Sequence, residues 1–286
     1  MDWVRAWIEA SAYCAALGVR VELLDAERAR LSLPYADENS NGDKALHGGV
    51  AASMVALGAQ TVARAALGPE SGPWHTSQLQ VAYLAAALGE GVAAEARLLR
   101  RGQELAYVDV DVQSEAGKSV ARGLACVRGR FGDEAAALPL AAGDAGLADR
   151  GPMGPFIGRV PFHAKLGIAV EHMAGARSRI ALPWRDGNAD AAGGVHEGAL
   201  LALLDTTGAM AAWAATGPGR FKASTPGIQA RILATPDRSG LVGYGSILHR
   251  DRELFFAQVE VARASDRCLV AQGTVNYRIV TPEHAR

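Results

Sequence analysis

The sequence predicts an α+β protein built from two fused copies of one domain, each copy a long buried helix wrapped by a curved antiparallel sheet. Two observations lead to this prediction: an internal repeat, and one order of helix and strand patterns that occurs in both halves. Residue i matches residue i+149 in type across most of each half, so that Leu17-Gly18-Val19 recurs as Leu166-Gly167-Ile168 and His47 recurs as His196. A repeat of this kind decides how the rest of the chain is interpreted. Because the unit is as large as a domain, we expect two domains related by a pseudo-twofold axis.

The composition is that of a packed globular protein. The 286 residues give room for two ordinary domains, and 49% hydrophobic with 21% charged residues argues against disorder. The net charge of −1 gives no support for binding to nucleic acid. Cys14, Cys126 and Cys268 do not match between the copies and lack metal-binding spacing, so we expect a reducing, cytoplasmic location and no metal site. The early charges in the first residues argue against a signal peptide.

Each copy begins with a short helical segment, around Trp7 to Leu17 in the first and Pro161 to Leu166 in the second. In the first copy two stretches of alternating apolar and polar residues follow, Val19 to Leu24 and Arg28 to Leu33, which is typical of half-buried strands. A polar loop from Asp37 to Asp43 leads to the next element.

That element is a helix from Gly48 to Leu67, apolar on nearly all sides and ended by the helix-stop signal Gly68-Pro69. A helix with no polar face must be covered on every side. The polar interruptions at Gln60 and Arg64, and the many alanines and glycines, favour a core helix over a membrane span.

Four further strands are predicted in the first copy, over Thr76–Leu84, Gly91–Arg100, Glu104–Gln113 and Ser119–Arg130. Glycine-containing turns between them suit antiparallel hairpins. One such sheet can wrap the helix, and two copies can pair edge to edge, which hides an exposed edge strand. We expect domains at residues 1–131 and 159–286, joined by an Ala-, Gly-, Asp- and Pro-rich linker at 132–158.

This order of elements, with His-Gly-Gly before the helix, resembles tandem (double) hotdog-fold acyl-CoA thioesterases of the phenylacetate-degradation and 4-hydroxybenzoyl-CoA type. In that family, the resemblance implies, the site lies between two units. One unit supplies an Asn six residues before the His and a backbone N–H of the turn, and the other supplies an acid nine residues after its own His. The resemblance is carried by Asn41, His47-Gly48-Gly49, Thr76, Leu79-Gln80-Val81-Ala82-Tyr83, His196, Gly198 and Asp205.

Each copy has lost what the other keeps at these positions. One complete set can be assembled only across the copies, and its mirror set lacks the helix acid and has acidic residues around the turn. The complete set is Asn41, His47, Gly48 and Asp205, and the mirror set is Asp190, His196, Glu197 and Ala56. Nine helical residues rise about 13.5 Å, so the short side chain of Asp205 cannot reach the loop of its own copy. We therefore expect one composite site per chain.

The expected chemistry follows from the residue types. The Gly48 N–H, at a helix N-terminus, would bind the thioester carbonyl oxygen. Burial would raise the pKa of Asp205, which would attack the carbonyl carbon or activate a water molecule, two routes that the sequence leaves open. Asn41 would orient the water or the carbonyl, and His47 would brace the turn. Substrate contacts are expected from Gly49, Thr76, Thr206, Arg100 and Arg101, the two arginines because coenzyme A carries phosphates.

The expected activity is hydrolysis of an acyl-CoA to the free acid and coenzyme A, in lipid or aromatic acid metabolism. No cofactor is expected beyond the coenzyme A of the substrate, and no nucleic acid or membrane partner. We expect a homo-oligomer of these chains. Two alternatives are a non-catalytic acyl-CoA binding or sensing module, which would need no acid at position 205, and an enoyl-CoA hydratase or dehydratase of the same fold. The second would need an Asp and His pair on one loop–helix unit, and that spacing is absent.

Overall fold

A computed structural model describes residues 1–130, 137–143, 146 and 148–282 of the chain. The first copy contains α1 (Asp2–Glu9), α2 (Ala12–Leu17), β1 (Arg20–Leu24), β2 (Arg28–Leu33), η1 (Asp37–Asn39), α3 (Gly48–Leu67), η2 (Pro69–Ser71), β3 (His75–Tyr83), β4 (Val92–Arg101), β5 (Leu105–Ser114) and β6 (Ser119–Arg128). The second contains α4 (Gly154–Ile157), α5 (Pro161–Leu166), β7 (Ala169–Ala174), β8 (Arg177–Leu182), η3 (Asp186–Asn188), α6 (Glu197–Thr216), β9 (Lys222–Ile232), β10 (Leu241–Asp251), β11 (Leu254–Arg263) and β12 (Leu269–Val280).

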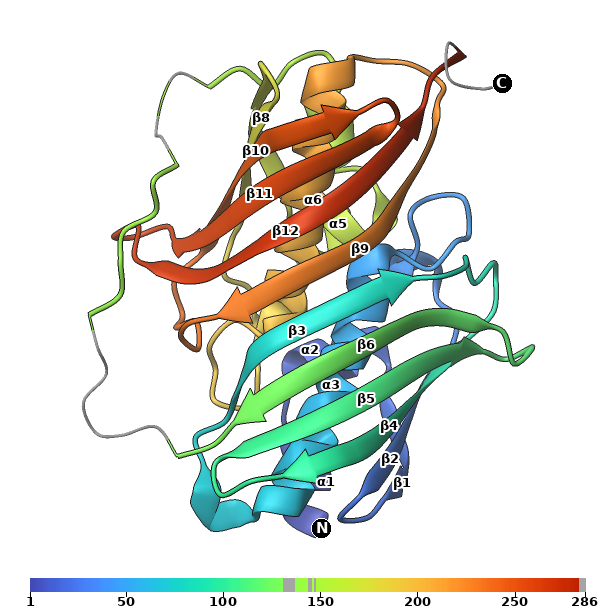
Figure 1. The fold of residues 1–286 in the computed structure, drawn as a ribbon, viewed down its shortest axis with the longest axis vertical. Helices are drawn as coiled ribbons and strands as arrows, with labels where there is room; N and C mark the ends of the chain where they lie inside the picture. Colours follow the sequence, from blue (N-terminus) through green and yellow to red (C-terminus); the bar gives the residue numbers. More distant parts are fainter. Residues whose placement is uncertain (131–136, 144–145, 147, 283–286) are drawn as a thin grey trace.

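The strands of both copies form one continuous antiparallel sheet (Figure 1). Across the described residues it has 12 strands in the order β1-β2-β4-β5-β6-β3-β9-β12-β11-β10-β8-β7. The copies meet where β3 pairs with β9, with Leu79 opposite Ala230 and Val81 opposite Ile228. From either end of the sheet, equivalent strands of the two copies follow in the same order. A pseudo-twofold axis therefore passes through the seam between β3 and β9. The predicted fold class, two fused copies of a helix wrapped by a sheet, is confirmed.

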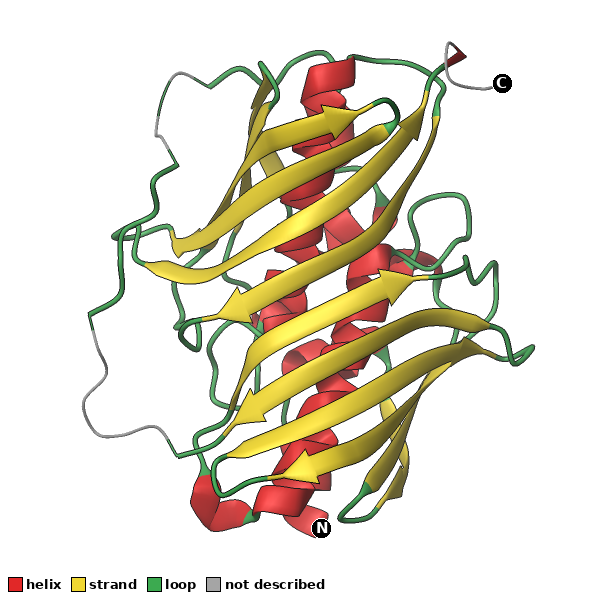
Figure 2. Ribbon diagram, in the orientation of Figure 1, coloured by secondary structure: helices red, strands yellow, loops and turns green. Residues whose placement is uncertain are grey.

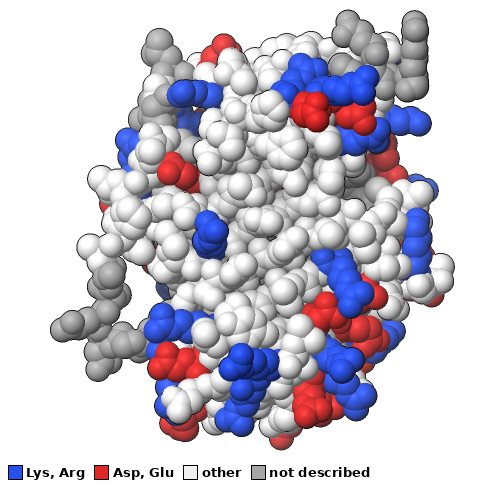
Figure 3. Space-filling model, viewed as in Figure 1, with Lys and Arg blue, Asp and Glu red and all other residues white. Residues whose placement is uncertain are grey.

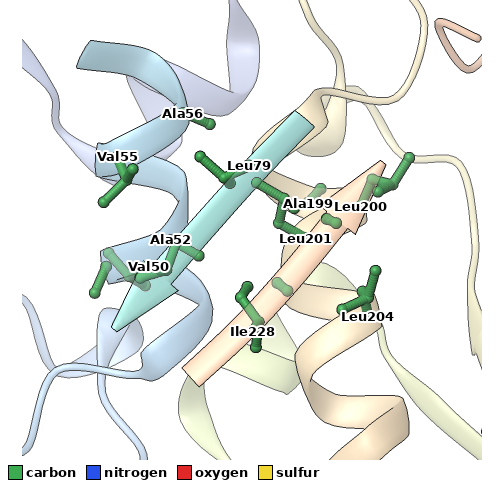
Figure 4. Packing of buried hydrophobic residues seen from close by; sticks show 14 of the residues in the cluster. Val50, Ala52, Val55, Ala56, Leu79, Ala199, Leu200, Leu201, Leu204 and Ile228 are labelled. Carbon is green, nitrogen blue, oxygen red and sulfur yellow. The ribbon is translucent and has the colours of Figure 1, made fainter. Parts of the chain in front are cut away.

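The two long helices, α3 and α6, lie side by side on the inner face of the sheet (Figure 2). Their N-terminal halves approach closely, because a Cβ on Gly49 would lie 2.7 Å from the Cβ of Ala202. Only a residue without a side chain fits there. Leu79 and Ile228, from the paired strands at the seam, belong to the same apolar core as residues of both helices (Figure 4).

Both long helices are apolar and long enough to cross a membrane by composition alone, but each lies mostly buried inside the protein. Their surroundings explain the missing polar face, since each is covered by the sheet on one side and by the other helix on another. This is the position predicted for core helices.

The second short helix of each copy, α2 in the first and α5 in the second, packs on the opposite copy. The Tyr13 N–H of α2 donates to the carbonyl of Ala189 in the second copy, at 3.0 Å. The Phe162 N–H of α5 donates to the carbonyl of Ser40 in the first copy, at 3.2 Å. Each copy thus supports the loop that precedes the long helix of the other.

The segment 132–158 differs from the predicted linker. Residues 132–136, 144, 145 and 147 of it lie outside the described residues. Its last part forms the four-residue helix α4, which occupies the repeat position of α1 and packs on β7. Ala141 accepts a hydrogen bond from Arg267 at 3.0 Å and so lies against the sheet. A helix this short leaves no periodicity in the sequence. The domain boundaries at 131 and 159 stay predictions.

Candidate active site

Asp205 of the second copy lies against the first turn of α3 in the first copy. Its Oδ2 is 3.0 Å from the point that a Cβ on Gly48 would occupy. Its Oδ1 accepts a hydrogen bond from the Thr225 hydroxyl at 2.9 Å, and the residue is only 5% exposed. One carboxylate oxygen is therefore held in place, and the other faces the start of the opposite helix.

Burial raises the pKa of Asp205 to about 6, and the hydrogen bond from Thr225 opposes this rise. Desolvation disfavours the charged form because the surrounding helix residues are apolar. A carboxylate with a pKa near neutrality is a stronger base than one in water. Asp205 is thus suited to accept a proton or to attack an electrophilic carbon.

Gly48 is the first residue of α3, where the helix dipole favours negative charge. Its N–H has no acceptor in the part of the chain that the structure describes, as expected for the first helical position. Because Gly48 carries no side chain, a ligand atom can approach this N–H and the Asp205 carboxylate together.

Tyr83, at the end of β3, is a third member of this group. Its Cε1 and Cζ atoms lie 3.5 and 3.7 Å from the same Cβ point on Gly48. Burial, with a further contribution from Asp205, holds the pKa of the phenol well above its ordinary value, so the hydroxyl stays protonated. The counterpart of Tyr83 in the repeat is Ile232. That break in the repeat is the sequence signal that could have identified it.

His47 braces the turn through a chain of hydrogen bonds. Its Nδ1 accepts from the Gly49 N–H at 3.0 Å, and its Nε2 lies 2.9 Å from Nε2 of His163. The Nδ1–H of His163 donates to the carbonyl of Ile157 at 3.0 Å, so its Nε2 accepts from His47, and the Thr206 hydroxyl lies 3.1 Å from the same nitrogen. Burial lowers the pKa of His47 well below its usual value and that of His163 to about 4. Both rings are neutral supports.

Comparison with known proteins agrees with this architecture. A family model described as "Domain of unknown function (DUF4442)" matches residues 4–127. Three solved structures align over nearly the whole chain. They are a candidate thioesterase from Novosphingobium aromaticivorans (17% identity, 91% of this chain and 98% of that one, TM-score 0.68), a conserved protein of unknown function with hot dog fold from Alicyclobacillus acidocaldarius (17%, 96% and 98%, 0.66), and the acyl-CoA thioesterase II TesB2 from Mycobacterium marinum (13%, 98% and 99%, 0.66). No curated protein sequence matches.

This chain has a double hotdog fold. The similarity to these structures lies under 25% identity and therefore concerns the fold. The phenylacetate-degradation and 4-hydroxybenzoyl-CoA branch, the cytoplasmic location and the homo-oligomer stay predictions.

Several predicted site residues have other hydrogen-bond partners in this fold. The N–H of Gly49 is bound by His47, and Gly49 serves the close contact with Ala202 rather than a substrate. Thr206 is engaged by His163. Asn41 is exposed, and its side-chain oxygen accepts from the Asp43 N–H at 3.1 Å within its own loop.

Arg100 and Arg101 lie at the end of β4. The end of β4 pairs with the start of β5, which pairs with the end of β6, which pairs with the start of β3. The start of β3 follows shortly after the C-terminus of α3. Gly48 begins α3, so the two arginines lie at the far end of the helix from the candidate site. Strand order rather than residue spacing determines this, and the contact of Arg100 and Arg101 with the phosphates of coenzyme A stays a prediction.

Thr76 lies in the mirror position of the site, which corrects the prediction that placed it beside Asp205. Its backbone N–H donates to Glu197 Oε1 at 3.0 Å, and its hydroxyl accepts from Gln60 at 3.1 Å. Glu197 is the counterpart of Gly48, and Ala56 stands here in place of the acid. The threonine beside Asp205 is Thr225, the repeat counterpart of Thr76. Thr225 and Asp205 belong to the same copy. The spacing of residues in the sequence does not reveal which of the two threonines lies beside the acid.

The mirror position holds a network of the protein's own side chains around a small cavity of about 30 Å³. Gln60 Nε2 donates to Glu197 Oε2 at 3.2 Å, and Arg64 Nε donates to Gln60 Oε1 at 3.2 Å. The Arg64 guanidinium lies 3.9 Å from the ring centre of Trp7 and 4.5 Å from that of Trp74. Burial raises the pKa of Glu197, while Arg64 and the hydrogen bonds oppose that rise. A polar network therefore stands where the complete set has Gly48 and Asp205.

The outer face of the sheet carries few charges over the seam between β3 and β9 (Figure 3). A hollow of about 900 Å³ lies on this face, with glutamines in its floor: Gln78, Gln80, Gln229, Gln258 and Gln272. The helices lie on the opposite face, so the sheet separates this hollow from Gly48 and Asp205.

Proposed function

We propose that this double hotdog protein hydrolyses acyl-CoA thioesters at one composite site, with Asp205 from one copy and Gly48 from the other. The observation that carries the proposal is the 3.0 Å distance between Asp205 Oδ2 and the Cβ position of Gly48. It brings a buried carboxylate of raised pKa next to the free N–H of Gly48 at a helix start. A base or nucleophile beside a donor for negative charge is the arrangement that acyl transfer requires.

The carbonyl oxygen of the thioester points toward the Gly48 N–H, and Asp205 lies on the side of the carbonyl carbon. As the carbon becomes tetrahedral, the negative charge that develops on the oxygen is stabilised by that N–H and by the dipole of α3. One such donor typically contributes about 3 kcal/mol in the transition state. Thr225 fixes the orientation of the carboxylate. Asp205 attacks the carbon directly or deprotonates a water molecule that does so.

The hydratase alternative is not favoured, because both ring nitrogens of His47 are engaged and its pKa is lowered. A neutral, fully bonded imidazole is a poor proton carrier. The solved relatives named as thioesterases, among them the TesB2 protein of Mycobacterium marinum, agree with the proposed reaction class. Asn41 is left out of the proposed catalytic set because its side chain is exposed and bonded within its own loop.

The test is thiol release from a panel of acyl-CoAs with short, medium, long and aromatic acyl groups. We expect hydrolysis by the wild type and a loss of at least about 100-fold in kcat for Asp205→Asn. Asp190→Asn, a matched carboxylate change in the mirror position, should retain activity. Full activity in Asp205→Asn would overturn the site. Tight acyl-CoA binding without hydrolysis across the panel would favour the binding module.

A single turnover in water enriched in ¹⁸O separates the two routes. If Asp205 activates water, the label enters the product acid in the first turnover. If Asp205 attacks directly and the resulting anhydride is opened at its own carboxyl carbon, the label enters the protein and the first product acid is unlabelled.

A further inference from the structure

Tyr83 carries a buried hydroxyl that makes no hydrogen bond with any residue that the structure describes. Two other phenols in the core have partners: the hydroxyl of the buried Tyr13 is 2.8 Å from that of Ser53, and the oxygen of the partly buried Tyr277 accepts from Trp213 at 3.1 Å. Leaving a buried hydroxyl without a partner costs about 1–3 kcal/mol. Such a group in a native protein needs an explanation.

The position of the phenol suggests one. The edge of the ring that bears the hydroxyl lies within 3.5–3.7 Å of the Cβ point of Gly48, and Asp205 Oδ2 is 3.0 Å from the same point. Three groups from three elements, β3, α3 and α6, therefore surround the space left by the missing side chain. This is where the carbonyl of a bound thioester lies in the proposed function.

The repeat shows that the fold does not require this hydroxyl. Ile232 takes the same place at the end of β9, where an aliphatic side chain completes the equivalent strand. The mirror position also lacks the glycine and the acid. Of the two equivalent positions, only the one beside Gly48 and Asp205 therefore has a tyrosine hydroxyl.

We propose that the Tyr83 hydroxyl donates a hydrogen bond to the carbonyl oxygen of the acyl thioester, as the side-chain partner of the Gly48 N–H. The proposal rests on the proposed function. In either route the negative charge of Asp205 passes to the carbonyl oxygen as the carbon becomes tetrahedral, and a second donor beside the Gly48 N–H stabilises that oxygen further. A phenol that stays protonated supplies a donor without adding charge.

Tyr83→Phe tests the proposal, with Tyr107→Phe as the matched control because Tyr107 is 37% exposed on β5. We expect kcat for Tyr83→Phe to fall about 100-fold with KM changed far less, as for loss of one oxyanion donor. The melting temperature should stay constant or rise, since a buried unpaired hydroxyl is removed. An unchanged kcat overturns the proposal. A fall in melting temperature that accompanies the loss of kcat also overturns it, because it indicates a structural role.

A binding experiment is independent of turnover. An acyl-CoA analogue with a methylene in place of sulfur keeps the carbonyl, and an alkyl-CoA thioether lacks it. Tyr83→Phe should weaken binding of the ketone analogue about tenfold, leave thioether binding unchanged, and shift the infrared C=O stretch of the bound ketone to higher frequency. Equal loss for both ligands contradicts the proposal.

These outcomes separate the two proposals. If Asp205→Asn is inactive and Tyr83→Phe is fully active, only the role of Tyr83 fails. If the wild type hydrolyses no acyl-CoA, the proposed function fails, and a carbonyl-specific loss of binding in Tyr83→Phe still supports the hydroxyl as the donor.

Discussion

At the scale of single residues, Asp205 combines a desolvated carboxyl with one fixed hydrogen bond from Thr225. If the ionised form is the active one, its pKa of about 6 sets the pH dependence of the reaction. We expect kcat/KM to rise about tenfold per pH unit below pH 6 and to level off above it. Rates measured from pH 4.5 to 8 check this. Thr225→Val removes a bond to the charged form and should move the bend to higher pH, whereas a bend near pH 4 in the wild type contradicts the assignment.

The same carboxyl predicts a change in stability. The pKa of Asp205 is higher in the folded protein than in the unfolded chain, so the folded state holds the proton more tightly. The stabilisation is complete below the unfolded pKa of about 4 and is lost as the pH rises through about 6. Asp205→Asn, which carries no charge, should therefore be more stable than the wild type at pH 8, by up to about 3 kcal/mol, and gain little at pH 4. Urea unfolding at both pH values measures this difference. Lower stability of Asp205→Asn at pH 8 would contradict the buried, ionised carboxylate.

At the scale of elements, the first turn of α3 contains two glycines with different roles. A Cβ on Gly49 meets the Cβ and Cα of Ala202 at 2.7 and 2.9 Å, whereas a Cβ on Gly48 meets only the ends of side chains, with Asp205 Oδ2 nearest at 3.0 Å. Gly49→Ala should therefore destabilise the protein by about 1–3 kcal/mol through overpacking. Gly48→Ala should change stability less but lower kcat/KM at least about tenfold, because it fills the space for the carbonyl. Denaturant unfolding and kinetics of both variants measure this contrast, and a reversed pattern would contradict it.

The long elements could be predicted from the sequence because their patterns are periodic. The helix from Gly48 to Leu67 has the predicted bounds, and the strands around it are displaced by a residue or two. The meeting of Gly48 and Asp205 was also accessible, since the losses in the two copies complement each other. What the sequence could not provide is the environment across elements. Tyr83 lies near the Gly48 turn because β3 ends there, and His163 lies near it because α5 crosses from the second copy. The periodicity of the sequence contains no information about either arrangement.

At the scale of the whole molecule, the chain has two pseudo-equivalent positions, one with Gly48 and Asp205 and the other with Glu197 and Ala56. Glu197→Gly in the mirror position should leave kcat within about twofold of the wild type, because the complete set of site residues lies elsewhere. It should lower stability by about 1–3 kcal/mol, since Gln60 and the Thr76 N–H lose their acceptor. The matched change Gly48→Glu should abolish activity, because it places a carboxylate where negative charge develops. Thiol release and melting temperature report on both variants. A heavy loss of activity in Glu197→Gly would contradict a single site per chain.

The seam between β3 and β9 joins the halves as a dimer interface would, but within one polypeptide. In an assembly of two identical subunits, every mutation appears twice, so a glutamate at the glycine position would have destroyed both centres at once. Covalent fusion removes that constraint. One of the two positions can therefore hold a cluster of tryptophans and an arginine while the other keeps Gly48 and Asp205. A single polypeptide tolerates such an asymmetry, which identical subunits related by a twofold axis could not have.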